Sequence, residues 1–180
     1  DSSSASFYGS QYSGYTNIAA AVRTAYTNLP LPWIKYDHNN KITNLFHNTQ
    51  ADCFAALMFR MVPDGQRENV LEILLNNANG INNFNSFYGV TPKLSTGYFF
   101  SSQGMLELTR KRKKKKGYEL LVDTGFHSWL YPVVNDFTTS WEGWSTWVQN
   151  IGYHPQQHFR SFNHLPFAAV GEWVWSVVGG

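Results

Sequence analysis

The chain has very little cysteine, little charge and no long apolar run. Its single cysteine, Cys53, cannot form a disulfide within the chain, and there is no second cysteine for a cysteine-based zinc site. Charged residues make up only 14% of the sequence. No apolar stretch reaches membrane-spanning length, and the first residues do not resemble a signal peptide. We therefore expect a soluble chain without a membrane partner, either secreted or cytoplasmic.

Aromatic residues, by contrast, are abundant. They make up 17% of the 180 residues and include seven tryptophans. Such a composition is typical of sugar-binding clefts and of large interfaces. A chain of this length suffices for one domain with one hydrophobic core, so we expect residues 1–180 to form a single piece with one functional site.

The basic residues are concentrated in one run, RKRKKKK, from Arg110 to Lys116, which holds half of the fourteen lysines and arginines. Clustered basic residues can bind polyanions such as nucleic acids. This run falls at an expected turn between two helices, however, where a solvated loop is the commoner role of a charge run. We attach no function to it and expect no nucleic-acid partner.

The spacing of apolar residues predicts helices over most of the chain. Residues 1–14 are rich in Ser, Gly and Tyr and are expected to form a loop that leads into the first helix. Helical spacing or helix-compatible sequence follows in six segments: Ile18–Tyr26, Phe54–Met61, Leu71–Ala78 with Asp64 as its N-cap, Gly97–Thr109, Gly117–Asp123 and Phe167–Val178. About six helices indicate an all-α fold. The long aromatic connection at residues 124–162 is expected to be a cleft loop that can contain short strands.

One stretch of this connection, TTSWEGWSTW at residues 138–147, places Glu142 among tryptophans and hydroxyl side chains. A carboxylate that takes a proton from water works best where bulk water is excluded and flat rings can position a sugar. The local sequence therefore allows Glu142 to act as a general base. The alternative is an exposed acid beside tryptophans that only pack.

Five stretches of the sequence carry a resemblance to a known family. TTSWEGW at residues 138–144 is similar to a Thr-Thr-Ile-Trp-Glu-Arg-Trp motif, and SFNHLPFAAVGEW at 161–173 to Ser-Phe-Asn-His-Tyr-x-Phe-Gly-Ala-Val-Gly-Glu-Trp. The other three are LSTGYFFSS at 94–102, HSWLYPV at 127–133 and NTQADCFAALMFRMVPDGQR at 48–67. In this order they resemble the α-L-rhamnosidases, inverting glycoside hydrolases built on an (α/α)6 barrel.

The resemblance implies roles for particular residues. Glu142 would be the catalytic general base, and the substrate-binding residues would be His164, Asn163, Trp141, Trp144 and Tyr98. His164 would bind sugar hydroxyls through its two ring nitrogens, while the other aromatic side chains would form walls of the sugar subsite. Two positions depart from the family pattern, because Gly143 stands in place of Arg and Leu165 in place of Tyr. An arginine contact to the base and one hydroxyl are therefore expected to be missing.

An inverting glycosidase also needs a general acid, held roughly 6.5–9.5 Å from the base so that a water molecule fits between them. In the family this acid lies upstream of the matched region, and nothing in residues 1–50 resembles its segment. Asp136 or Asp123 could stand in for this acid, but ordinary loop or capping roles suit both residues better.

A complete barrel needs twelve helices, so the resemblance implies a partial (α/α)6 barrel, the C-terminal half of the catalytic domain. The chain would be a fragment, one subunit of a split enzyme or an inactive remnant. Its expected partners are a rhamnose-containing glycoside or polysaccharide and the missing N-terminal half of the barrel. The alternative function is a non-catalytic carbohydrate-binding or interaction module derived from such an enzyme.

Two other sites can be considered from residue types. His154 and His158 lie four residues apart, but Pro155 and the lack of a glutamate between them argue against a metal-binding helix. Cys53 lies on a helical apolar face without a basic neighbour, so packing suits it better than a nucleophilic role with His47. We expect no metal and no cofactor.

Overall fold

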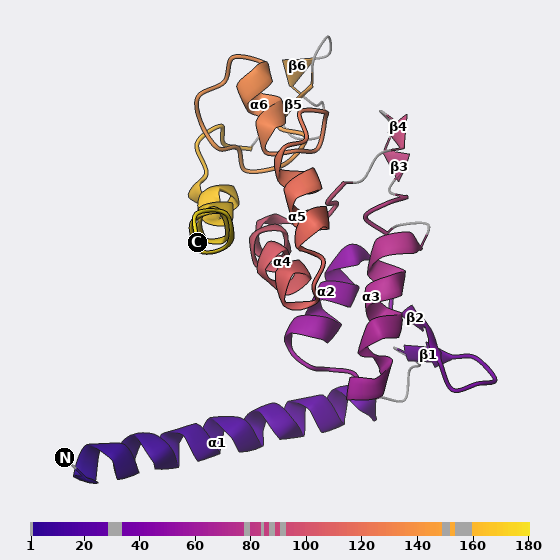
Figure 1. Ribbon diagram of the computed structural model, residues 1–180, viewed down its shortest axis with the longest axis vertical. Coiled ribbons are helices and arrows are strands. Elements are labelled where there is room, and N and C mark those ends of the chain that lie inside the picture. The colour runs from indigo at the N-terminus through magenta and orange to yellow at the C-terminus, as the bar shows by residue number, and fades with distance from the viewer. Residues whose placement is uncertain are drawn as a thin grey trace.

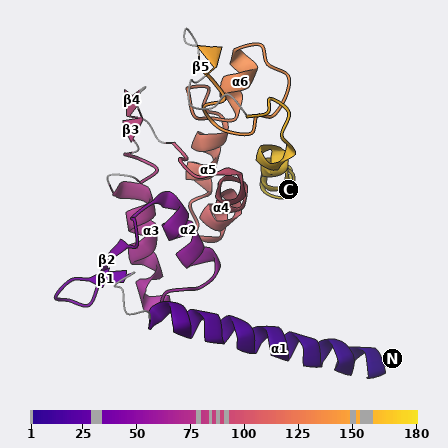
Figure 2. The ribbon, with the colours of Figure 1, turned by 180° about the vertical axis from the view of Figure 1, so that it is seen from behind.

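The computed structural model shows a mostly helical chain (Figures 1 and 2). It describes residues 2–28, 34–77, 80–83, 85–86, 89–90, 93–148, 152–153 and 160–180. The α-helices are α1 Ser2–Thr27, α2 Gln50–Met58, α3 Arg67–Asn76, α4 Tyr98–Arg110, α5 Lys114–Leu121, α6 Leu130–Val134 and α7 Val170–Trp173. Antiparallel pairs join β1 Ile34–Tyr36 to β2 Ile42–Leu45, β3 Asn85–Ser86 to β4 Gly89–Val90, and β5 Trp147–Val148 to β6 Gly152–Tyr153.

The expected loop over residues 1–14 was wrong, because α1 begins at Ser2. No proline occurs before Pro30, and serine and glycine lower helix propensity without forbidding the conformation. Since helix growth is cooperative, the periodic segment from Ile18 extends towards the N-terminus. In both views α1 runs away from the body of the molecule, and the segment that holds α6, β5 and β6 lies at the opposite end (Figures 1 and 2).

Helices α2, α3 and α4 pack around one hydrophobic core. Thr49 begins α2 with a capping box, since its side chain accepts from the Asp52 amide while the Asp52 side chain accepts from the Thr49 amide. Phe54 of α2 is fully buried against Gly104 of α4, where a Cβ atom would lie 2.6 Å from Phe54 Cζ. The glycine is therefore needed for the close approach of the two helices.

The expected N-cap at Asp64 was also wrong. Asp64–Gln66 forms a short 3₁₀ helix, and α3 begins after it at Arg67. The Asp64 carboxylate forms an ion pair of 2.6 Å with the Arg67 guanidinium instead of accepting from the backbone. The Pro63-Asp64 pair thus correctly predicts a turn before α3, but it does not predict the residue at which α3 begins.

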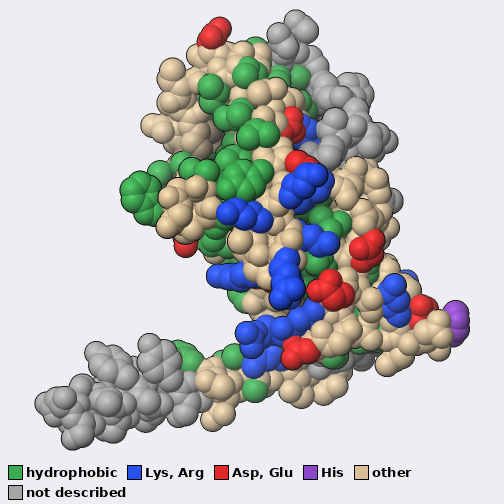
Figure 3. All heavy atoms as spheres, viewed as in Figure 1, with side chains coloured by type: hydrophobic (Ala, Val, Ile, Leu, Met, Phe, Trp, Pro, Cys, Tyr) green, Lys and Arg blue, Asp and Glu red, His purple; other side chains and the backbone are tan. Residues whose placement is uncertain are grey.

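The basic run spans the end of α4 and the start of α5. The turn lies at residues 111–113, as expected, and Lys114–Lys116 form the first turn of α5, which begins before the expected Gly117. Glu107 pairs with Arg110 and Lys111 at 3.5 and 3.8 Å. Lysine and arginine side chains gather on this face of the molecule (Figure 3), and most of the run is exposed.

The C-terminal segment continues from a 3₁₀ helix, Leu165–Ala169, through α7 into a π-helical turn, Val174–Val178. Trp173 anchors it, because this fully buried indole packs on Gly117 of α5 and donates to Thr109 Oγ1 at 2.7 Å. A Cβ atom at Gly117 would lie 2.8 Å from the ring. Trp175, by contrast, is 85% exposed.

The aromatic connection at 124–162 contains the short strands β5 and β6, as expected, and also α6, which the sequence analysis missed. Ser128 Oγ accepts from the Tyr131 amide at the start of α6. Pro132 lies inside this short helix, near its N-terminus, where a missing N–H costs no helical hydrogen bond.

No helix among the described residues is long and apolar enough to cross a membrane.

Candidate functional site

The two family-like motifs of the C-terminal region lie side by side. The Glu142 amide donates to the Ser161 carbonyl at 2.9 Å, and the His164 amide donates to the Ser140 carbonyl at 2.7 Å. Thr139 Oγ1 also donates to the Phe162 carbonyl. Segments 139–142 and 161–164 are therefore joined by main-chain and side-chain hydrogen bonds, which bring together residues that are about twenty positions apart in sequence.

The Glu142 carboxylate is held by this pairing. Its Oε2 atom accepts from the Ser161 amide at 2.7 Å, so Glu142 and Ser161 form two reciprocal hydrogen bonds. The side chain is half-buried. One carboxylate oxygen is thus fixed by a backbone N–H.

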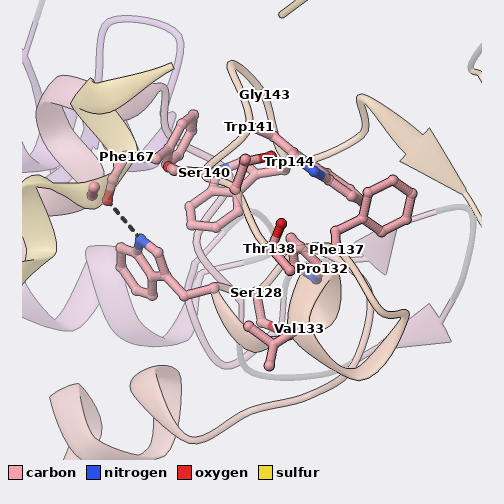
Figure 4. Close-up of a pocket in the computed structure, with 13 residues that line it drawn as sticks. Ser128, Pro132, Val133, Phe137, Thr138, Ser140, Trp141, Gly143, Trp144 and Phe167 are labelled. Carbon is pink, nitrogen blue, oxygen red and sulfur yellow. Dashed lines mark hydrogen bonds between the residues drawn. The ribbon is translucent and has the colours of Figure 1, made fainter. Parts of the chain in front are cut away.

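An aromatic cavity of about 420 Å³ lies beside this segment (Figure 4). Its walls are formed mainly by aromatic rings and small polar side chains. They comprise Ser128, Trp129, Pro132, Val133, Phe137, Thr138, Thr139, Ser140, Trp141, Gly143, Trp144, Phe167 and Ala168. Glu142 is not among them, and its carboxylate is directed to the Ser161 amide. The structure therefore places Trp141 and Trp144 in the cavity wall and the acid next to it.

Hydrogen bonds hold two of the cavity tryptophans in place. Trp144 Nε1 donates to the Thr96 carbonyl at 2.7 Å, and Trp129 Nε1 donates to the Phe167 carbonyl at 3.0 Å (dashed in Figure 4). Trp141 is 4% exposed, yet its Nε1 atom is buried without a hydrogen-bond partner among the described residues. A buried donor without a partner is costly, and this N–H is not exposed at the cavity surface in this conformation.

His164 and Tyr98 lie together near Phe167. The rings of Tyr98 and His164 are 5.7 Å apart, and those of Tyr98 and Phe167 are 6.5 Å apart. The Phe167 ring also lies 4.4 Å from Trp144. His164 Nδ1 is buried without a partner in the described part of the chain. Phe167 thus connects the two groups of predicted residues.

Asn163, the remaining predicted residue, is exposed. Its amide donates to Ser161 Oγ at 3.0 Å, and Ser161 Oγ donates to the Asn163 carbonyl at 3.1 Å. The sequence analysis missed Ser161, Phe167 and Trp129 as parts of the site. All three occur inside the quoted family-like motifs, which was the only available signal for them.

In the structure, the two candidates for the general acid, Asp123 and Asp136, have other roles. Asp123 forms an ion pair with Lys93, whose side chain is only 5% exposed, and its Oδ1 atom accepts from the Gly125 amide at 2.9 Å. Asp136 is exposed in a turn after α6 with a φ of 64°. Aspartate is among the residues that tolerate this left-handed conformation, so both residues have structural explanations.

Lys93 also belongs to a network that leads to the cavity. The buried Gln50 side chain donates to the Lys93 carbonyl and accepts from the Ser95 amide, both at 3.0 Å. Residues 93–95 are thereby tied to α2, next to Thr96, whose carbonyl holds Trp144. The core thus positions one wall of the site.

Two titrating groups, Cys53 and His127, have large shifts of their pKa values. Burial, with a smaller contribution from Asp52, raises the pKa of the Cys53 thiol to about 12. The thiol is therefore protonated and packed in the core, as expected. Burial, together with Lys93, lowers the pKa of His127 to about 4. No group of three or more metal-ligating side chains occurs among the described residues, and His154 and His158 lie outside them.

Comparisons with known proteins give the family. Residues 8–178 match the family described as bacterial alpha-L-rhamnosidase 6 hairpin glycosidase domain. The chain is 29% identical over 134 residues to an alpha-L-rhamnosidase of Formosa agariphila, and 34% identical over 87 residues to one of Streptomyces avermitilis. These alignments cover 73% and 48% of this chain, but only 13% and 8% of those proteins.

Solved structures agree with the sequence matches. The crystal structure of Streptomyces avermitilis alpha-L-rhamnosidase complexed with L-rhamnose matches 91% of this chain, with a TM-score of 0.71 and 25% identity. That of the native enzyme from Aspergillus terreus matches 95%, with a TM-score of 0.74 and 27% identity. The matches span 14% and 18% of those chains. The expected all-α fold, a partial (α/α)6 barrel, is confirmed, and the chain belongs to the bacterial α-L-rhamnosidase six-hairpin glycosidase domain family.

Proposed function

We propose that the complete protein to which this chain contributes hydrolyses terminal α-L-rhamnose from glycosides with inversion, and that Glu142 is its general base. The observation that carries the proposal is the Glu142 carboxylate, which is fixed through one oxygen by the Ser161 amide next to a tryptophan-walled cavity. The relatives named alpha-L-rhamnosidase, one of them solved with L-rhamnose, supply the substrate class.

The fixed carboxylate suits the base of an inverting reaction. With Oε2 accepting from Ser161, Oε1 can accept a proton from a water molecule. The water oxygen forms a bond to the anomeric carbon while the bond from that carbon to the leaving oxygen breaks. A carboxylic acid on the opposite side of the sugar gives its proton to the leaving oxygen. We assign that acid to the part of the protein upstream of this chain.

The polar atoms without partners suit the sugar. His164 Nδ1 and Trp141 Nε1 are both buried and have no hydrogen-bond partner among the described residues. A sugar hydroxyl can donate or accept, so it can satisfy either atom once a small side-chain movement exposes that atom. Tyr98, next to His164, and Trp144 offer aromatic surface for the apolar face of the sugar ring, and the exposed Asn163 side chain can reach its hydroxyls.

The partner we propose is the remainder of the (α/α)6 barrel, supplied in cis or in trans. Helix α1 exposes apolar side chains, with Tyr15, Ile18 and Val22 at 68%, 61% and 53% exposure. Hydrophobic side chains also lie at the surface over the C-terminal helical segment (Figure 3), where Trp175 is the most exposed. Unpaired apolar faces of this kind are typical of interaction surfaces.

The second candidate is a carbohydrate-binding module without catalysis, which is favoured by the structural surroundings of Asp123 and Asp136. An aryl α-L-rhamnoside assay separates the two functions, using this chain alone, a candidate upstream half alone, and the mixture. Turnover that requires both parts supports the enzyme. L-Rhamnose binding to this chain, with no turnover by the mixture or by the full-length protein, supports the binding module.

A further inference from the structure

The Arg160 side chain lies in a notch beside Gly143, where a Cβ atom would displace the guanidinium. A Cβ atom at Gly143 would lie 1.7 Å from Arg160 Nη1, 2.9 Å from Cζ and 3.1 Å from Cδ. Gly143 is buried, and its φ is not in the positive range that favours glycine. The guanidinium can therefore take this position because residue 143 has no Cβ atom, and the backbone conformation at 143 does not itself require glycine.

Arg160 is also the only lysine or arginine after Lys116. It is exposed and forms no ion pair within 4.0 Å with any acid that the structure describes, Glu142 included. No side-chain hydrogen bond joins it to the described residues either. Among the described residues, Gly143 is the one that the guanidinium is shown to approach closely.

This contact lies next to the hydrogen bonds that hold the acid. The peptide between Arg160 and Ser161 carries the N–H that donates to Glu142 Oε2, and the Ser161 carbonyl accepts from the Glu142 amide. The Arg160 side chain extends from this same part of the chain to Gly143, the residue that follows Glu142. Segments 142–143 and 160–161 are therefore joined by one main-chain hydrogen bond, by one hydrogen bond from a backbone amide to the carboxylate, and by the contact between the guanidinium and Gly143.

We propose that Arg160 is a positioning residue for Glu142. Seated in the Gly143 notch, it holds the 160–161 peptide in register, so that the Ser161 amide points at Oε2 and fixes the carboxylate. Arg160 in this way supplies, from the opposite segment, the guanidinium that position 143 lacks. The catalytic consequence rests on the proposed function, but the positioning itself is a property of this chain.

The test measures amide hydrogen exchange at Ser161 in this chain by NMR, because a hydrogen-bonded amide exchanges only after local opening. The variants are Gly143→Ala, Arg160→Ala and the double variant. Gly171→Ala is the control, since a Cβ atom there meets nothing within 4 Å. We expect each single variant to lose about tenfold in Ser161 protection, on the scale of one lost hydrogen bond.

The double variant should lose no more than either single variant, because both changes remove the same contact. Gly171→Ala should keep the protection of the parent chain. Unchanged protection in Arg160→Ala, or losses that multiply in the double variant, would overturn the proposal. Since Arg160 is exposed, Arg160→Ala is expected to fold, and its melting curve checks this.

The same variants in a rhamnosidase-active complete protein give a second readout. A positioning role predicts a lower kcat on a neutral aryl α-L-rhamnoside with little change in KM. An unchanged kcat, with a higher KM only for substrates that carry a carboxylate or sulfate, would instead make Arg160 an anion-binding residue and overturn the proposal. If no active protein is obtained, the proposed function fails while the exchange result still decides whether Arg160 positions Glu142.

Discussion

The buried ion pair between Lys93 and Asp123 provides a sharp test of whether Asp123 is structural or chemical. The Lys93 side chain is 5% exposed and that of Asp123 is 25% exposed. Removing one partner of a buried pair leaves an uncompensated charge and costs about 3–5 kcal/mol. Because Asp123 keeps some contact with solvent, we expect Asp123→Ala to lower the free energy of unfolding by about 3 kcal/mol, at the lower end of this range.

Urea denaturation followed by tryptophan fluorescence measures this loss, with Asp136→Asn as the control. Asp136 is exposed and has no ion pair within the described residues, and asparagine also tolerates its φ of 64°, so this change should alter stability little. The structural assignment predicts that Asp123→Ala is destabilised and that any rhamnosidase activity of the complete protein survives at low temperature. A variant as stable as its parent but without turnover would refute the reasoning and make Asp123 a candidate general acid.

Three other properties can be tested in the same chain. Gly104→Ala should destabilise it by about 1–3 kcal/mol in urea titrations, because the added methyl would lie 2.6 Å from Phe54 Cζ; a neutral result would contradict the close helix contact. Cys53 should resist alkylation at pH 8 until the chain is unfolded, since its pKa is about 12; rapid labelling of the folded chain would contradict its burial. His127 has a pKa near 4, below its usual value of 6.5, so it favours the folded state above pH 6.5, and this stability should be lost as the pH falls towards 4. His127→Asn should flatten that part of the pH profile, and an unchanged profile would exclude His127 as its cause.

The helical part of the fold could be predicted because its apolar residues recur at helical spacing. Phe54 and Leu57 in α2 and Leu71 and Leu74 in α3 are all buried, as a one-sided apolar face requires. Helix α6 could not be predicted in this way, because it is only five residues long and contains Pro132. The N-terminal part of α1 was missed because its Ser and Gly content is typical of loops.

The sequence indicates candidate site residues, whose roles stay predictions, but it does not give their arrangement. The motifs around Glu142 and His164 indicated the two segments, and the structure joins them through the pairing of Glu142 with Ser161. That Trp141 faces the cavity while Glu142 is directed to a backbone amide depends on this pairing between distant residues. The sequence shows that position 143 has glycine in place of the arginine of the family pattern. Only the fold shows that the Arg160 side chain lies next to Gly143.

The most direct test of the account is Glu142→Gln in the complete protein, with turnover of an aryl α-L-rhamnoside and L-rhamnose binding measured on the same preparation. Glutamine keeps the size of the side chain and an oxygen for the Ser161 amide, but it cannot accept a proton from water. We predict a loss of turnover of at least about 10³-fold with rhamnose affinity nearly unchanged. A variant that keeps most of its turnover would contradict the assignment of Glu142 as the base.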